Sequence, residues 1–361
     1  MNDLQNVTQD IVISFLSNLK FSSLKRVNNF VHMWNNHDGI LVTFSDQEII
    51  DKYILESILL QAHKSKTEFV EYLKSQKEIL VKDCVIAYVD ILGFKELIEN
   101  AGTDENKLNQ LLNHLNSAYR SAYTRLEDRQ SISKRYTFDT VNQTRIYTDN
   151  IICVKELSPW PRDGEPEIGH LLEHIAHYQL DLALNGHFSR GILVLDKAYC
   201  DEKIIFGNSF IHFDEYEKQI KYPRVILDED TVAKVKVYLT WYCRPEICPF
   251  KDDLIIDQDK KWFINYLIIL KMFNDDLMDW KKGKVRTSEG YYPEAINELK
   301  KHRDEVLKNI NLFRDSNGGI FEKYVWLANY HNYFCRNYFA LDTSLLIEDD
   351  DLYEHQFFPI M

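Results

Sequence analysis

The sequence predicts an α+β fold, and three observations lead to that prediction. A β-branched and aromatic run at residues 84–94 includes a late glycine, as expected of a central strand that ends at a turn. Helical periodicity follows it, and two short strands then form a hairpin at 145–157. The order from residue 84 to 230 is β, α, α, β-hairpin, α, β, β, α, β. This order is typical of helices that cover one face of a mostly antiparallel sheet.

Residues 1–82 are predicted to form an N-terminal helical region. Across residues 47–80, apolar side chains recur near i, i+3, i+4 and i+7, and the stretch contains neither Pro nor Gly. We expect this region to support the rest of the chain or to mediate dimerisation.

Residues 83–230 are predicted to be the sheet-containing domain, with a ferredoxin-like centre. A helix at 170–186 is closed by Gly186, a residue that commonly ends helices. The other expected elements are strands at 84–94, 188–199, 203–206 and 223–228, helices at 95–102, 106–128 and 207–221, the hairpin at 145–157, and a polar, extended insert at 131–143.

Residues 231–361 are predicted to be a C-terminal helical extension. Segments 252–270 and 294–313 have a helical texture, and residues 323–339 are so rich in aromatic side chains that they must pack against something. A packed core or dimer seam explains this aromatic tail better than base stacking does.

The amino-acid composition argues against some classes of function. The 361 residues carry 43 basic and 56 acidic side chains, a net charge of −13, with no basic stripe to follow a phosphate backbone, which argues against a nucleic-acid partner. No apolar run reaches the length of a membrane helix, and the first ten residues lack the layout of a signal peptide. We therefore expect a cytoplasmic protein with reduced cysteines and no membrane partner.

Two carboxylates lie where packing alone does not explain them. Asp90 interrupts an apolar strand, where an uncompensated charge is costly, and a helix cap or salt bridge is the simple explanation. Asp149 adds a second acid at the bend of RIYTDNIICV, residues 145–154. Two carboxylates at the ends of inner strands are a standard way to hold two divalent ions for phosphoryl transfer.

With these motifs the chain resembles class III nucleotidyl cyclases over residues 84–230. The family's aromatic-x-Asp-Ile motif matches YVDI at 88–91, and its second metal Asp matches Asp149 in YTDN. The interval, 149 − 90 = 59 residues, is longer than the family's, and the insert before residue 145 accounts for it. The family's phosphate-contacting Arg matches Arg190 in SRGIL.

The resemblance implies a reaction and its residues. The ribose 3′-hydroxyl of a nucleoside triphosphate attacks the α-phosphorus and pyrophosphate leaves. Two Mn²⁺ or Mg²⁺ ions are implied, bound by Asp90, Asp149 and the backbone carbonyl of Ile91, because hard cations take oxygen ligands. Asp90, Asp149 and Arg190 are thus the implied catalytic residues, with Arg190 neutralising phosphate charge.

The substrate-binding positions depart from the purine cyclases. Ile204 stands where they carry an Asp that accepts from the adenine amino group, and an unpaired buried amino group costs about 1–3 kcal/mol. Arg145 stands where adenylyl cyclases carry a base-reading Lys, and a donor there suits pyrimidine oxygens. Tyr88 completes the expected substrate-binding set. The transition-state Asn and Arg are replaced by Ile211 and Glu215.

Two interpretations follow from these departures. One is a catalytically degenerate module that only binds a nucleotide. The other is a pyrimidine cyclase of the Pycsar antiphage type, which the chain resembles in VDILGF, YTDN and FSRGI and in its C-terminal segments. Retention of both metal acids and Arg190 favours the second interpretation.

The Pycsar resemblance implies a product and partners. UTP, ahead of CTP, would be converted to cUMP or cCMP, which a separate effector protein reads. The enzyme would be a homodimer with its active sites at the interface, and Arg224 and Lys218 are candidates for groups given to the partner subunit.

Two rivals come from other classes. In a non-enzymatic helical scaffold, the acids would serve only as caps. A template-directed two-metal phosphoryl transferase would make linear products, but it needs a basic groove that a chain of charge −13 lacks.

Overall fold

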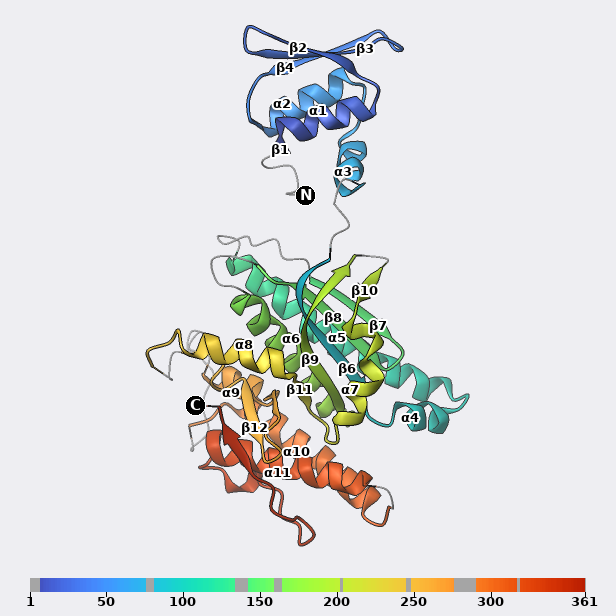
Figure 1. Ribbon diagram of the computed structural model, residues 1–361. Coiled ribbons are helices and arrows are strands. Elements are labelled where there is room, and N and C mark those ends of the chain that lie inside the picture. Colours follow the sequence, from blue (N-terminus) through green and yellow to red (C-terminus); the bar gives the residue numbers. More distant parts are fainter. Residues whose placement is uncertain are drawn as a thin grey trace. The chain divides into compact units, whose positions relative to one another are not determined.

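The computed structural model describes residues 7–75, 81–133, 142–158, 164–201, 204–244, 248–275, 290–316 and 319–360. They belong to two compact units, Met1–Leu80 and Val81–Met361. Figure 1 colours the chain from blue at the N-terminus to red at the C-terminus. Most of the insert predicted at 131–143 lies outside the described residues. No helix within the described ranges is long and apolar enough to span a membrane.

The N-terminal unit combines helices with a sheet, so the prediction of a purely helical region is wrong for residues 22–45. Asn28 and Asn29, with φ of 50° and 65°, form the first tight turn, and Gly39, with φ of 67°, lies in the second. The elements are α1 (Gln9–Asn18), α2 (Lys52–Gln61), α3 (Lys66–Ser75), the antiparallel sheet of β2 (Ser22–Val27), β3 (Phe30–Asn35) and β4 (Ile40–Ser45), and the short pair β1 (Val7–Thr8) and β5 (Ile49–Ile50).

The second unit has a ferredoxin-like centre, as predicted. Its four strands lie in the order β9-β6-β8-β7, and every neighbouring pair is antiparallel. This is the order of a βαββαβ unit. The elements in sequence are β6 (Lys82–Ile91), α4 (Phe94–Ala101), α5 (Glu105–Ser133), β7 (Asn142–Tyr147), β8 (Asn150–Glu156), α6 (Glu165–Leu184) and β9 (Ser189–Cys200).

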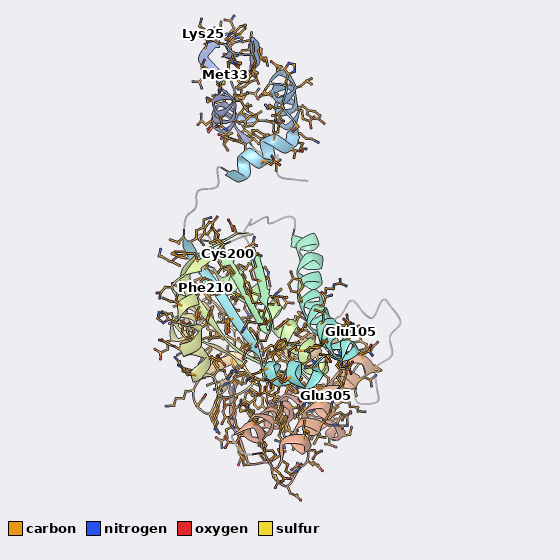
Figure 2. The ribbon with its side chains drawn as sticks, turned by 90° about the vertical axis from the view of Figure 1, so that its right-hand side faces the viewer. Lys25, Met33, Glu105, Cys200, Phe210 and Glu305 are labelled. Carbon is orange, nitrogen blue, oxygen red and sulfur yellow. The ribbon has the colours of Figure 1, made fainter. Side chains whose placement is uncertain are left out.

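The two faces of this sheet differ. Helices α5 and α6 cover one face, and Val85, Ala87 and Val89 of β6 are fully buried there (Figure 1). Toward the end of β6, the alternate residues Tyr88 and Asp90 are only half-buried, because they point to the other face. Figure 2 shows Phe210 on the opposite side of the sheet from Glu105, the first residue of α5.

The C-terminal part continues the same sheet, so the prediction of a helical extension is only partly right. Strand β11 (Val225–Leu227) runs parallel to β9, and β13, β12 and β14 follow it outward. The runs LIID and WFI are too short for helices, and they pair as a buried hairpin. The remaining elements are β10 (Ile205–Gly207), η1 (Ser209–Ile211), α7 (Phe213–Gln219), α8 (Glu229–Leu239), β12 (Leu254–Asp257), β13 (Trp262–Ile264), α9 (Ile268–Asp275), α10 (Pro293–Phe313), α11 (Ile320–Tyr338), η4 (Thr343–Leu345) and β14 (Phe357–Pro359).

A buried ionic network joins the sheet to this C-terminal part. Arg224 is 1% exposed and pairs with Asp257, whose other partners include the indole N–H of Trp326, at 2.8 Å, and His355. Arg224 therefore does not serve a partner's active site, and that expectation is wrong. Lys218 is exposed on α7, and its suggested role stays a prediction.

Candidate active site

The centre of the site is set by strand register. Asp90 lies opposite Asn150 of β8 on one side and opposite Arg190 of β9 on the other. Directly opposed residues of an antiparallel pair point to the same face, so Asp90 and Arg190 share the face that α5 and α6 leave uncovered. Asp149 immediately precedes Asn150, at the end of the neighbouring hairpin.

A strained turn presents Asp149. Tyr147 pairs with Asn150, so Thr148 and Asp149 form a two-residue loop, and Thr148 has a φ of 53°. A β-branched residue in the left-handed region is a true outlier, and such outliers are concentrated at functional sites. Two donors orient the carboxylate: the Thr148 hydroxyl at 2.5 Å and the Asn150 amide at 3.1 Å, both to Oδ1 of Asp149.

The two carboxyl groups interact. The pKa of Asp90 is raised to about 6, mainly by burial; Arg190 opposes the rise, and the hydrogen bond and charge of Asp149 add to it. Burial disfavours the charged form of a carboxylate, and a second carboxylate nearby adds to this effect. The Asp90 and Asp149 carboxyl groups thus lie near each other. Their joint role as metal ligands stays a prediction.

Arg190 bridges two acids. Its Nε donates to Oδ2 of Asp90 at 3.2 Å, and its Nη2 donates to Glu217 of α7. The next residue, Gly191, allows β9 to lie close to β6, because a Cβ atom there would come within 2.2 Å of the carbonyl oxygen of Tyr88. The glycine therefore keeps Arg190 next to Asp90.

The carboxylates of Asp90 and Asp149 and the carbonyl of Ile91 are oxygen ligands of the kind that hard divalent cations take. Among the described residues there is no group of three or more His, Cys, Asp or Glu side chains that could hold a metal ion. Two carboxylates and the Ile91 carbonyl leave several positions for water and phosphate oxygens. Mg²⁺ sites that act on phosphates commonly have this composition, and Mn²⁺ also accepts such oxygen ligands.

Two of the expected substrate-binding residues, Tyr88 and Arg145, lie one side-chain position away from Asp90 on the same face of the sheet. Tyr88 pairs across β8 with Ile152, which pairs with Arg145 of β7, so Tyr88 and Arg145 share the face of Asp90. The Tyr88 ring stacks on Phe213, with centroids 4.1 Å apart. Arg145 donates to the carbonyls of Thr144, at 3.1 Å, and Asp201.

Ile204 belongs to the same turn as that carbonyl. Its N–H donates to Oδ1 of Asp201 at 2.7 Å, and the residue is 52% exposed. The structure thus brings Arg145 and Ile204 to one turn, without placing the Ile204 side chain in a closed pocket. Ile211 is 75% exposed, and Glu215 lies 3.3 Å from His212.

Three residues of this region escaped the sequence analysis: Phe213, Glu217 and Lys323. The first two come from α7, and Lys323 comes from α11. Burial and the Arg190 charge lower the pKa of Lys323, while Asp90, Glu96 and Glu217 oppose this effect. No sequence signal marks Lys323, which follows Asp90 by 323 − 90 = 233 residues.

Comparison with known proteins gives remote likenesses. No family model and no curated protein matches the sequence. The crystal structure of the guanylyl cyclase Cya2 matches at 10% identity and a TM-score of 0.24, over 42% of this chain and 78% of that one. A class III adenylyl cyclase-like ATP-binding protein from Pseudomonas aeruginosa matches at 10% identity and a TM-score of 0.27, over 51% and 47%.

A bacterial light-regulated adenylyl cyclase matches at 14% identity and a TM-score of 0.29, over 60% of this chain and 64% of that one. Likenesses of this size do not support an argument about activity. The function proposed below therefore rests on the residues of the site.

Proposed function

We propose that this protein is a nucleotidyl cyclase that converts a nucleoside triphosphate to a 3′,5′-cyclic mononucleotide and pyrophosphate. One observation carries the proposal: Asp90 and Asp149 interact on the open face of the sheet, and Arg190 lies directly beside them. Two acids and an arginine at the ends of three antiparallel strands suit two-metal phosphoryl transfer.

The residues have distinct roles in this proposal. Asp90, Asp149 and the Ile91 carbonyl hold two Mn²⁺ or Mg²⁺ ions. When bound, such ions lower the pKa of the ribose hydroxyl and neutralise charge on the leaving phosphates. Arg190 exchanges Glu217, whose side chain is 41% exposed, for a phosphate oxygen. The strained Thr148 turn fixes Asp149 before substrate arrives.

The proposed substrate is a pyrimidine nucleotide, UTP ahead of CTP. Arg145 offers donors to base oxygens, and Ile204 offers no acceptor to an amino group. The product, cUMP or cCMP, would act as an antiphage signal in the cytosol and be read by a separate effector. A homodimer is proposed, in which the partner subunit supplies what Ile211 and Glu215 do not.

The test is direct. The full-length protein is incubated with each of the four ribonucleoside triphosphates and Mn²⁺, and the products are identified by mass. We expect cUMP from UTP, a smaller amount of cCMP from CTP, and no product from the Asp90→Asn or Asp149→Asn variant. Linear oligomers, or no product from any triphosphate, would contradict the proposal.

A second candidate function is a nucleotide-binding module without catalysis. The exposed Ile211 and the Glu215 carboxylate, at the positions of the transition-state pair, favour it. In that case Mn²⁺ with UTP raises the melting temperature, but the nucleotide is recovered unchanged. A non-enzymatic scaffold would show neither effect.

A further inference from the structure

We propose that Lys323 of helix α11 is a phosphate-binding residue of the candidate active site, directed at the triphosphate tail of the substrate. The inference rests on the proposed function and deepens it. It adds a residue from the C-terminal part of the chain to the candidate site. The residues expected from the sequence all lie between Tyr88 and Ile204.

Two contacts hold the first turn of α11 against the site. Glu322 forms an ion pair with Lys221, which follows α7, with Oε2 and Nζ 2.7 Å apart. Tyr324 packs edge-on against Phe188, with ring centroids 5.9 Å apart. These residues flank Lys323 on both sides in the sequence, so the position of its backbone is fixed.

Phe188 connects helix α11 to the strand that carries Asp90, one of the proposed metal ligands. Its carbonyl accepts from the N–H of Leu92 at 2.8 Å, at the point where β6 has just ended and β9 begins. Asp90 and Arg190 are each two residues away from that contact. The figures agree with this placement, since α10 and α11 lie at the end of the sheet toward which β6 runs (Figures 1 and 2).

The charges around Lys323 are those of the site itself. Asp90, Glu96 and Glu217 are the acids that act on its ammonium group, and Arg190 is the neighbouring cation. Lys323 is half-buried, and within the part of the chain that the structure describes it makes no hydrogen bond or ion pair. Its ammonium is thus within electrostatic range of the acidic cluster.

This state differs from that of Arg190, whose guanidinium already contacts Asp90 and Glu217. A half-buried, unpaired ammonium is costly to maintain in a purely structural role. A Lys ammonium is a compact point charge on a flexible stem, able to follow the oxygens of a moving polyphosphate. The β- and γ-phosphates carry most of the substrate's negative charge, so they are the groups we assign to Lys323.

The test measures how affinity depends on the phosphate chain. Full-length wild type, Lys323→Gln and the control Lys301→Gln are titrated with UTP, UMP and pyrophosphate, each with Mn²⁺, by calorimetry. We expect Lys323→Gln to weaken UTP and pyrophosphate binding about tenfold, because a charge-assisted contact is lost, and to leave UMP binding unchanged. Lys301 is exposed on α10, so Lys301→Gln removes the same charge while leaving the Lys221–Glu322 ion pair intact, and it should alter none of the three affinities.

A second measurement uses the wild type alone and does not depend on how the variants fold. The protein is treated with an amine-acetylating reagent, and the modified lysines are located by mass spectrometry. Mn²⁺ with UTP or pyrophosphate should protect Lys323, whereas Mn²⁺ with UMP should not. The exposed Lys301 should be acetylated equally in all samples.

The outcomes separate the two proposals. A wild type that forms no cyclic product and binds no Mn²⁺-pyrophosphate would overturn the proposed function. A wild type that forms product, together with an unprotected Lys323 or an unchanged pyrophosphate affinity in Lys323→Gln, would overturn only the role of Lys323. Equal weakening of UTP and UMP binding in Lys323→Gln would assign it a structural role and also overturn this inference.

Discussion

Two arginine–carboxylate clusters lie side by side in the sheet and differ in their exposure. The N–H of Gly191, next to Arg190, donates to the carbonyl of Arg224 at 3.1 Å. The Arg224 side chain is 1% exposed, pairs with Asp257 and Asp259, and lies within 6 Å of three aromatic rings. The Arg190 side chain is 20% exposed and pairs with Asp90 and Glu217.

The difference teaches how the same side chains serve structure in one place and chemistry in another. The Asp257 carboxylate is buried and has four partners, namely the side chains of Arg224, Trp326 and His355 and the backbone N–H of Gln258, so its hydrogen-bonding capacity is already used. The acids beside Arg190 are partly exposed, and burial raises the pKa of Asp90, so the charges of that cluster are less completely paired. Incomplete clusters of this kind are candidates for function. The following predictions test the contrast, from the largest effect on unfolding free energy to the smallest.

Arg224→Met should give the largest loss of stability. It leaves Asp257 as a buried carboxylate without its main cation, and breaking a buried pair typically costs about 3–5 kcal/mol. Urea unfolding, followed by circular dichroism, measures the change. A loss below about 1 kcal/mol would show that the buried network is not essential to the sheet.

Asp90→Asn should stabilise the metal-free protein while abolishing activity. The folded-state pKa of Asp90 is about 6, above the ordinary value of 3.8, so its contribution is fully favourable at low pH and is lost as pH rises through 6. By linkage, the charged form costs up to about 3 kcal/mol at pH 7.5, and Asn removes this cost.

Unfolding measured in chelator from pH 5 to pH 8 checks this expectation. The variant should gain on the wild type as pH rises. Asp83→Asn, on the exposed start of the same strand, is the matched control and should show no such trend. A constant difference between wild type and Asp90→Asn across this pH range would contradict the raised pKa.

Arg190→Met should change the unfolding free energy by only about 1 kcal/mol, since its ion pairs are partly exposed. Product formation should nevertheless fall about 100-fold or more, as happens when a preorganised donor to transition-state charge is removed. Urea unfolding and steady-state rates measured on the same sample give both numbers. Full activity would remove Arg190 from the site.

Asp259→Asn should have the smallest effect. Its carboxylate also pairs with Arg224 but is 44% exposed, and such pairs contribute less than about 1 kcal/mol. Urea unfolding beside Arg224→Met gives the comparison. An effect as large as that of Arg224→Met would mean that the exposed half of the network carries its stability.

Local patterns made much of the fold predictable. The β-branched run of β6, the β7–β8 hairpin and the helical periodicity of α6 each determine their own structure, so all three were placed correctly. The hairpins at residues 22–45 were missed although the Asn28-Asn29 turn and Gly39 are recognisable turn signals. Strands β12 and β13 were missed because runs of three or four residues become strands only through partners that are distant in sequence.

The sequence indicated those residues of the candidate site whose polarity differs from that of their neighbours in the chain. Asp90 interrupts an apolar strand and Asp149 occupies a tight turn, so each residue can be recognised from its neighbours in the sequence. Glu217 and Lys323 are ordinary charges on amphipathic helices, and only tertiary packing brings them near Asp90. Whether Arg145 and Ile204 read a base is a matter of substrate geometry and stays a prediction.

The continuous sheet limits how this chain can be divided. Strand β11 pairs with β9 on one side and with β13 on the other, at Ile226 and Phe263. A fragment ending at residue 230 would retain both acidic residues but present an open row of backbone amides and carbonyls, which invites aggregation. Expression, fusion and crystallisation work should therefore treat Val81–Met361 as indivisible.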